Sequence, residues 1–157
     1  PGGAEVIPVV STEEMLEACL AVFPTCDGMI AAAAPSDYRP MKVEEQKIRK
    51  TGESIVLHLV ETPDVVALLG AVRKNQWMVG FALETDDLRM RAMQKLERKN
   101  CDLIVANGPA AIHADHTAIE VLDRKGAVIA ACTGSKASVA EELIRLILDR
   151  FVPHAGR

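Results

Sequence analysis

Short stretches that are apolar at almost every position alternate along this chain with segments of helical character. These stretches are 27–34 (DGMIAAAA), 77–83 (WMVGFAL) and 101–107 (CDLIVAN). Strands without a polar face are typical of a parallel sheet that helices cover on both sides, and their alternation with helices indicates the α/β class. The sequence therefore predicts a three-layer αβα fold around a mostly parallel sheet.

Capping residues mark the starts of two helices. Ser11 precedes Glu14 by three residues, which is the spacing of a capping box. Thr62 and Pro63 are typical of the cap and the first position of a second helix. The other predicted elements are strands at 5–10 and 55–60, a helix from Thr85 to about Lys99, a hairpin that turns at Lys125-Gly126 between 118–123 and 127–132, and a helix at 135–152.

The composition fits one ordinary domain. The chain has 157 residues, of which 49% are apolar and 25% charged, and this supplies enough apolar side chains for a core. The net charge of −4 does not give the surface the overall positive charge that is typical of nucleic-acid-binding proteins, so any site for an anion must be local. No stretch approaches the ~20 apolar residues of a membrane span. We therefore expect neither nucleic acid nor a membrane as a partner.

The cysteines and the first residues indicate a cytoplasmic location. Cys19, Cys26, Cys101 and Cys132 show no CxxC spacing, which favours free thiols in a reducing compartment. The start, PGGAEVIPVV, has neither the charged region nor the apolar region of a signal peptide. Since the chain begins abruptly and without Met, we expect a fragment or a trimmed chain.

The least regular segment is 35–54, which is polar, basic and contains prolines. Loops of about twenty residues inside a compact domain are usually functional or mobile. Lys47, Arg49 and Lys50 form its basic cluster. The commoner interpretation of such a cluster is a solvated loop; the alternative is a flap that brings cations to an anionic ligand.

Three strands end in small or polar residues: AAAAPSD, GFALETD and LIVANG. In open α/β sheets ligands bind beyond the carboxyl ends of strands, and small residues there let a flat ligand approach the backbone. Lys95 and Lys99 lie four apart on one predicted helix. They either complement the helix dipole or, with the basic loop, form a local polyanion site for a nucleotide triphosphate.

Several standard motifs are absent from the sequence. It contains neither the GxxxxGK[ST] loop nor the GxGxxG turn. The run His113-Ala-Asp115-His116 resembles a set of metal ligands, but zinc needs about four ligands and no further ones follow at the usual spacing. We therefore predict no structural metal.

Longer motifs resemble one family. AAAAPSDYRP followed by KIRK, then TPDVVALLG, VGFALETDDLRMRAMQKLERKNCDLIVAN and GSKASVAEELI, are similar in order and approximate spacing to bacterial phosphopantothenoylcysteine synthetase over nearly the whole chain. The resemblance implies a Rossmann-like core, a homodimer and a ligase of coenzyme A biosynthesis. It also implies a single synthetase domain over residues 1–157, without flavin, that lacks its first βα unit.

The resemblance also implies the reaction and its residues. The family joins 4′-phosphopantothenate to cysteine through an acyl-cytidylate formed from CTP, with Mg²⁺. By the matching motifs, Lys47 is implied to be catalytic and to lie on a mobile flap. The implied nucleotide-binding residues are Asp37, Lys47, Pro63, Asp64, Val65, Val66, Phe81, Lys95 and Lys99.

The sequence departs from the family pattern in three places. The Gly/Thr-rich turn and the Asn-containing segment that bind phosphopantothenate in the family are not in these residues, and IHADHT at 112–117 replaces a GF…N loop. Leu83 stands where bacterial members have Ala, which is closer to the ATP-using branch. Three hypotheses therefore stay open: a CTP- or ATP-dependent ligase, a nucleotide-binding module that cannot catalyse, and a Rossmann-like binding protein of another function. Whether a decarboxylase domain precedes this one also stays open.

Overall fold

A computed structural model of the chain describes residues 3–50, 52–83, 88–107 and 116–152. Its helices and strands are α1 (Thr12–Val22), a 3-10 turn (Phe23–Thr25), β1 (Gly28–Ala31), β2 (Tyr38–Pro40), β3 (Leu59–Glu61), α2 (Val65–Val72), β4 (Trp77–Leu83), α3 (Leu88–Arg98), β5 (Leu103–Asn107), β6 (His116–Asp123), β7 (Val128–Ser135) and α4 (Lys136–Phe151).

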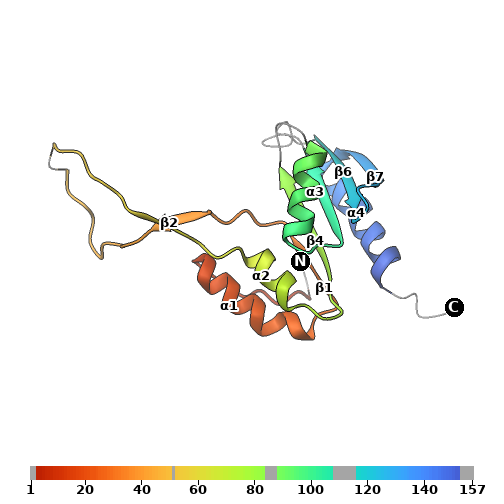
Figure 1. Cartoon of the computed structure of the whole chain (residues 1–157), viewed down its shortest axis with the longest axis horizontal. Coiled ribbons are helices and arrows are strands. Elements are labelled where there is room, and N and C mark those ends of the chain that lie inside the picture. Colours follow the sequence, from red (N-terminus) through yellow and green to blue (C-terminus); the bar gives the residue numbers. More distant parts are fainter. Residues whose placement is uncertain (1–2, 51, 84–87, 108–115, 153–157) are drawn as a thin grey trace.

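One five-stranded sheet organises the body of the molecule (Figure 1), with the strand order β1-β4-β5-β6-β7. β1, β4 and β5 are parallel, and β6 and β7 continue the sheet antiparallel. The parallel part comes from the three apolar stretches of the sequence, since β4 and β5 are buried along most of their length. The predicted α/β class, the parallel strands and the hairpin are confirmed.

Helices cover both faces of this sheet. On one face α1, α2 and α3 enclose a core in which Leu69 and Leu96 meet Met78 and Ile104. On the other face α4 packs Val139, Leu143 and Ile147 against β4, β5, β6 and β7. The three-layer αβα arrangement was predicted correctly. Successive residues of a buried strand point to opposite faces of the sheet, so each strand contributes apolar side chains to both cores.

The predicted cap of α1 is confirmed, and the structure adds a cap for α4. Ser11 accepts a hydrogen bond from the Glu14 backbone N–H at 3.1 Å, and the Glu14 carboxylate accepts one from the Ser11 N–H. Ser135 caps α4 through the N–H of Ser138. The hairpin turns as predicted, with Gly126 at φ 77°, a conformation that a side chain disfavours.

The prediction for the start of α2 is wrong by two residues. The helix is capped by Asp64, whose Oδ1 accepts from the Ala67 N–H at 3.1 Å. Thr62 instead donates its hydroxyl to the Ser36 carbonyl at 2.5 Å. Both residue types cap helices, and the contact of Thr62 with a distant loop decides between them. For α3, Thr85 and the acidic pair Asp86–Asp87 lie outside the described residues.

Two predicted strands are wrong in whole or in part. Residues 5–10 form no strand, and Val10 is 97% exposed. Of the stretch 55–60 only the end is in β3, which pairs with β2 outside the main sheet. β1 is likewise shorter than predicted and partly exposed. An apolar stretch becomes a strand only where a neighbouring strand receives its backbone hydrogen bonds.

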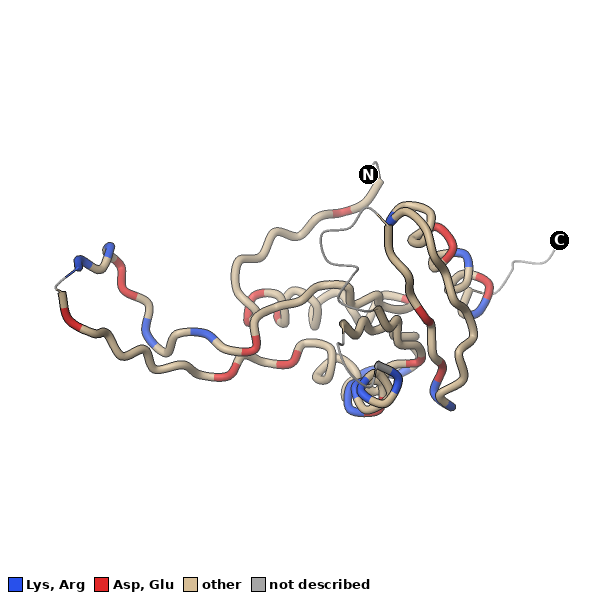
Figure 2. The backbone as a smooth tube through the Cα atoms, turned by 90° about the horizontal axis from the view of Figure 1, so that it is seen from above, with Lys and Arg blue, Asp and Glu red and all other residues tan. Residues whose placement is uncertain are grey.

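A long arm leaves the body between β2 and β3 (Figures 1 and 2). β2 and β3 pair antiparallel at its base, and the Met41 N–H donates to the His58 carbonyl at 2.8 Å. Beyond that bond the described residues of 42–57 form no strand or helix and are exposed. The arm is the predicted protruding flap, and Arg39 at its base pairs with Glu13 of α1.

Candidate functional site

A cleft of about 500 Å³ lies beyond the carboxyl ends of the parallel strands. Small residues, Ala31 to Ala34 and Gly80, line part of it. The start of α2 and the second half of α3 contribute the other walls, and Asn107 lines it from the end of β5. This is the position at which α/β sheets bind ligands.

The structure brings eight of the nine predicted site residues together. The residues that line the cleft are Asp37, Pro63, Asp64, Val65, Val66, Phe81, Lys95 and Lys99. They come from four segments that are far apart in the sequence. The strand-end rule predicted this meeting for the residues after β1, and the side chains of α2 and α3 join them because both helices pack on the same face of the sheet.

Asp64 connects the two helices at the cleft. Lys99 Nζ lies 3.0 Å from Asp64 Oδ1, and an Arg98 guanidinium nitrogen lies 3.8 Å from Oδ2. Partial burial raises the pKa of the Asp64 carboxyl, but the hydrogen bonds from Lys99 and from the Ala67 N–H outweigh burial and lower it below its usual value. Asp64 is therefore ionised near neutral pH and holds Lys99 in place.

Lys99 is positioned by the close packing of α2 against the end of α3. Its carbonyl oxygen lies so near Gly70 that a Cβ atom there would be 2.2 Å away. The next residue, Asn100, has φ 51° and donates its side-chain amide to the Gly70 carbonyl at 2.8 Å. The Asn100 side-chain oxygen accepts from Arg124 at 2.9 Å and Arg73 at 3.3 Å. The Lys99 side chain is consequently only 15% exposed.

The loop after β1 is tied to the start of α2. The Thr62 N–H donates to the Asp37 carbonyl at 2.9 Å, beside the hydroxyl contact of Thr62 with Ser36. These two bonds hold the loop that carries Asp37 beside the start of α2, and Asp37 lines the cleft together with Lys95 and Lys99. The exposed Asp37 carboxylate therefore faces solvent at the rim.

Lys47 is not in the cleft. It lies on the exposed arm together with Arg49 and Lys50, and the arm extends away from the body in both views (Figures 1 and 2). Bringing Lys47 to a ligand in the cleft would therefore require the arm to bend. The mobility predicted for the flap stays a prediction.

Sequence reasoning missed part of the cationic wall. Arg98 lines the cleft with Lys95 and Lys99, and Arg91 extends the row along α3. The helical spacing of Arg91, Lys95 and Arg98, at i, i+4 and i+7, was the signal that could have found them. Figure 2 shows α3 nearly end-on, with Lys and Arg positions gathered on it.

The structure describes only part of the metal-like run, and it describes all four thiols. His113 and Asp115 lie outside the described residues, and His116 opens β6. Across the part of the chain that the structure describes, no three His, Cys, Asp or Glu residues gather as a metal site. All four cysteines are free thiols, as predicted. Among the helices described, none has both the length and the apolar character that a bilayer crossing needs.

The chain matches known proteins along nearly its whole length. Residues 1–151 match the family described as DNA/pantothenate metabolism flavoprotein, C-terminal domain. The chain is 35% identical to the coenzyme A biosynthesis bifunctional protein CoaBC of Haemophilus influenzae over 155 residues, which is 96% of this chain and 38% of that protein. With CoaBC of Bacillus subtilis it shares 44% over 106 residues, 68% of this chain and 26% of that protein.

Another curated relative carries a different name. A cysteine/cysteine sulfinic acid decarboxylase from an unknown prokaryotic organism is 40% identical over 148 residues, which is 91% of this chain and 41% of that protein. The chain thus spans about two fifths of the length of the first curated relatives it matches.

Solved structures share the fold. The crystal structure of the C-terminal domain of CoaBC superposes with a TM-score of 0.74 at 27% identity, covering 94% of this chain and 66% of that one. A DNA/pantothenate metabolism flavoprotein from Streptococcus pneumoniae has a TM-score of 0.74 at 23% identity, covering 92% and 75%, and supports the fold alone. The chain therefore belongs to the DNA/pantothenate metabolism flavoprotein C-terminal domain family, the phosphopantothenoylcysteine synthetase domain that the sequence motifs predicted.

Proposed function

We propose that this domain serves an acid–amino-acid ligase of coenzyme A biosynthesis, in which 4′-phosphopantothenate is joined to cysteine through an acyl-cytidylate made from CTP. The observation that carries the proposal is the cleft itself, which is lined by small residues at the strand ends, by Asp37 and the start of α2, and by Lys95, Arg98 and Lys99 of the end of α3. A flat base fits the first part and a triphosphate the second.

The reaction has two steps. A carboxylate oxygen of 4′-phosphopantothenate attacks the α-phosphorus of CTP, the bond to the β-phosphate oxygen breaks, and pyrophosphate leaves. The amine of cysteine then attacks the acyl carbon of the acyl-cytidylate. The amide forms, CMP leaves with the bonding electron pair, and the amine loses a proton.

Both reactants of the first step are anions, so their repulsion must be cancelled. Lys95, Arg98 and Lys99 contribute positive charge from a rigid helix. Lys99 is held by Asp64 at 3.0 Å and by the packing of Gly70, so it needs little reorganisation when the nucleotide binds. Preorganised charge of this kind stabilises developing negative charge most effectively.

Lys47 is proposed to act at the reacting phosphate after the arm bends over the cleft. One donor that acts on developing charge is worth about 10²–10³ in rate. The arm offers the length for this movement, because its strand pairing ends at the Met41–His58 hydrogen bond and the described residues beyond are exposed. We also propose that the apolar side chains of the arm, such as Val43 and Val56 at 80% and 78% exposure, contact a second copy in a homodimer.

Mg²⁺ fits the cleft as a companion of the nucleotide. Magnesium is usually held by one or two carboxylates together with substrate phosphates and water. Asp37 is a carboxylate at the rim, whereas Asp64 is already engaged by Lys99. Asp37 would therefore be the residue that could hold such an ion together with the phosphates of the nucleotide. When bound, the ion adds Lewis-acid neutralisation of the phosphate oxygens. No flavin is proposed for this domain.

Calorimetry and turnover separate the three hypotheses. Titration of this chain with CTP, ATP and CMP should show CTP bound more tightly than ATP, because the SDYRP and KIxK motifs are of the bacterial type. Pyrophosphate release with 4′-phosphopantothenate, cysteine and CTP should then be measured on the chain and on a longer protein that includes it.

The outcomes differ for each hypothesis. Binding with turnover in either protein supports the ligase, and equal or tighter binding of ATP overturns the choice of CTP. Binding without turnover in both identifies a module that cannot catalyse. Absence of nucleotide binding contradicts the proposed function and favours another Rossmann-like role.

A further inference from the structure

A polar network lies beyond the amino ends of β4 and β5, at the opposite end of the sheet from the cleft. Its side chains come from the C-cap of α2, the residue after α3, the residue before β5 and the β6–β7 turn. In that order the residues of the network are Arg73, Asn100, Asp102 and Arg124. None of them is among the residues that line the cleft. Any part that the network plays at the site must therefore act through other residues.

Asp102 is the acceptor that both arginines share. Its Oδ2 accepts from the Arg73 guanidinium at 2.5 Å and from the Met78 N–H at 2.8 Å. Its Oδ1 accepts from Arg73 at 3.3 Å and lies 3.1 Å from Arg124 Nε. A guanidinium presents its donors in a rigid plane, so a carboxylate bound in this way fixes the orientation of both groups. The network is thus anchored to the start of β4.

Asn100 connects the two arginines to the end of α3. Its side-chain oxygen accepts from both of them, and its backbone carbonyl accepts from Arg124 at 3.2 Å. Its amide donates to the Gly70 carbonyl at 2.8 Å. Asparagine is also one of the few residue types other than glycine that adopt a φ of 51° readily. One residue therefore ends α3 and holds that end against α2 and the β6–β7 turn.

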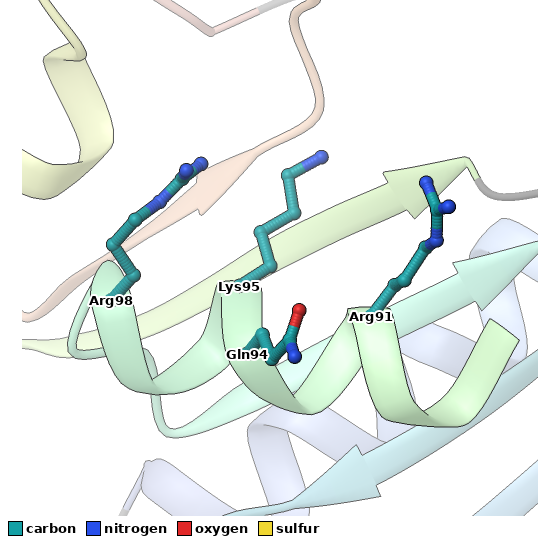
Figure 3. Close-up of a pocket in the computed structure, with 4 residues that line it drawn as sticks. All are labelled: Arg91, Gln94, Lys95 and Arg98. Carbon is teal, nitrogen blue, oxygen red and sulfur yellow. The ribbon is translucent and has the colours of Figure 1, made fainter. Parts of the chain in front are cut away.

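The residue before Asn100 is Lys99, whose two ends contact different parts of α2. Its carbonyl packs against Gly70, and its Nζ lies 3.0 Å from Asp64. Six residues separate Gly70 from Asp64, which is about 9 Å along a helix. The side chain must therefore run back along α2, and the place of the ammonium group depends on where the backbone is held. Arg98 differs, since it extends from α3 (Figure 3) with 69% of its side chain exposed and can reorient by itself.

From these contacts we infer that the network is a positioning device for Lys99, which holds the end of α3 against α2 so that the ammonium group stands at the cleft before a nucleotide arrives. The inference rests on the proposed function where it concerns the nucleotide. Asn100 is the positioning residue that passes the constraint on, because it is bonded both to the network and to the Lys99 backbone. A preorganised cation binds more tightly than one that the ligand must first order.

Two variants break the network at different points. Asn100→Gly deletes the amide and keeps a backbone conformation that glycine adopts freely. Arg124→Ala removes the donors of the β6–β7 turn and leaves the end of α3 unaltered in sequence, so it carries the test if Asn100→Gly does not fold. The matched control is Val139→Ala, which destabilises the core on the other face of the sheet. Thermal unfolding of each variant gives a temperature at which all of them are folded.

The first measurement needs no nucleotide. Partial burial raises the pKa of the Asp64 carboxyl, but the bonds from Lys99 and the Ala67 N–H lower it overall. The pKa of Asp64 therefore reports whether the ammonium group is in place. An NMR titration that follows the carboxyl carbon should show this pKa rising toward its ordinary value in Asn100→Gly and Arg124→Ala. Val139→Ala should leave it unchanged, because a general loss of stability does not move Lys99.

The second measurement is the dissociation constant of CTP by calorimetry on the full chain. We expect Asn100→Gly to weaken CTP about two- to tenfold, since the nucleotide would then have to order a long side chain as it binds. The same change made in a Lys99→Met background should cost no further affinity, because residues that act through one another are not additive. Val139→Ala should bind CTP as the wild type does.

The outcomes separate the inference from the function on which it rests. If the pKa of Asp64 stays low in both network variants, the network does not position Lys99 and the inference is wrong, whatever the cleft binds. If that pKa rises but the wild type binds no CTP, the positioning of Lys99 is supported and the proposed function is overturned. If the wild type binds CTP and Asn100→Gly binds it equally well, or loses as much affinity in the Lys99→Met background, the inference fails and the proposed function stands.

Discussion

Replacing Gly70 with alanine tests the contact that positions Lys99. Gly70 lies inside α2 and is buried. A Cβ atom on it would lie 2.2 Å from the Lys99 carbonyl oxygen and 3.1 Å from the carbonyl carbon. These are backbone atoms, so no side chain can rotate to make room. α2 and the end of α3 would have to separate by about 1 Å to reach ordinary contact.

The expected magnitude follows from three contributions. Glycine to alanine inside a helix normally stabilises by about 1 kcal/mol. Overpacking a close contact costs about 1–3 kcal/mol, and a separation of this size also weakens the Asn100–Gly70 hydrogen bond, worth about 1 kcal/mol. We therefore expect Gly70→Ala to lower the free energy of unfolding by about 2 kcal/mol, and Tm by about 4–8 °C for a domain of this size.

Urea and thermal unfolding measure this change, with Ala71→Gly as the control. Ala71 is the next residue of the same helix and is exposed, so its replacement reports helix propensity alone and should cost about 1 kcal/mol. A Gly70→Ala variant as stable as the wild type, or more stable, would refute the reasoning, because propensity would then outweigh the contact.

The same variant should also weaken nucleotide binding. Moving α2 away from α3 lengthens the 3.0 Å contact between Asp64 and Lys99 and leaves Lys99 less well oriented toward the cleft. CTP affinity measured well below the unfolding temperature should therefore fall in Gly70→Ala and stay unchanged in Ala71→Gly. Equal affinities in folded Gly70→Ala and wild type would show that the packing does not position Lys99.

Three further predictions concern single side chains. Lys47→Ala should lower kcat of the ligase reaction about 10²–10³-fold and change the free energy of unfolding by less than about 0.5 kcal/mol; near-normal turnover at saturating CTP would mean that Lys47 is an ordinary solvated lysine. The pKa of Asp64 is lowered in the fold, although burial opposes this, because Lys99 and the Ala67 N–H bind the carboxylate. Its stabilising contribution is therefore present above the unfolded pKa of about 3.9 and is lost as the pH falls through the lower folded value. Wild type and Asp64→Asn should consequently differ in their free energy of unfolding at neutral pH. Unfolding followed by circular dichroism should show that this difference shrinks as the pH falls below about 4. Burial raises the pKa of the Cys101 thiol to about 11, so at pH 8 a thiol reagent should modify exposed Cys26 rapidly and Cys101 only on unfolding; fast labelling of Cys101 in a Cys26→Ser variant would contradict its burial.

The parts of the fold that depend on local pattern could be predicted from the sequence. β4 was predicted residue for residue, since a strand that is apolar at every position can bury both of its faces only between two cores. The capping box of Ser11 and Glu14 was predictable because both partners lie within one helical turn. The position of Asp37 beyond the end of β1 followed from the rule for strand ends.

The parts that depend on distant partners could not be predicted in this way. The stretch 5–10 has the composition of a strand but no strand pairs with it among the described residues, and strand pairing is a property of two segments. The choice of Asp64 over Thr62 as the cap of α2 is made by Ser36, twenty-six residues from Thr62. Arg98, which Figure 3 shows beside Lys95 on α3, is indistinguishable in the sequence from an ordinary solvated cation near a helix end, and only the fold shows that it lines the cleft.

The covalent path of the chain connects the arm to the cleft. Asp37 lines the cleft and is followed directly by β2, while β3 ends at Glu61, next to Thr62, whose N–H donates to the Asp37 carbonyl. The base of the arm is held by strand pairing, by Arg39 with Glu13, and by Thr62 with Ser36. A bend that brings Lys47 to the cleft must therefore occur beyond the Met41–His58 bond, where the described residues have no partner strand. Such a bend would leave Asp37 and Asp64 in place, so the nucleotide site can form before the arm closes, and Lys47 would meet a ligand that α2 and α3 already hold.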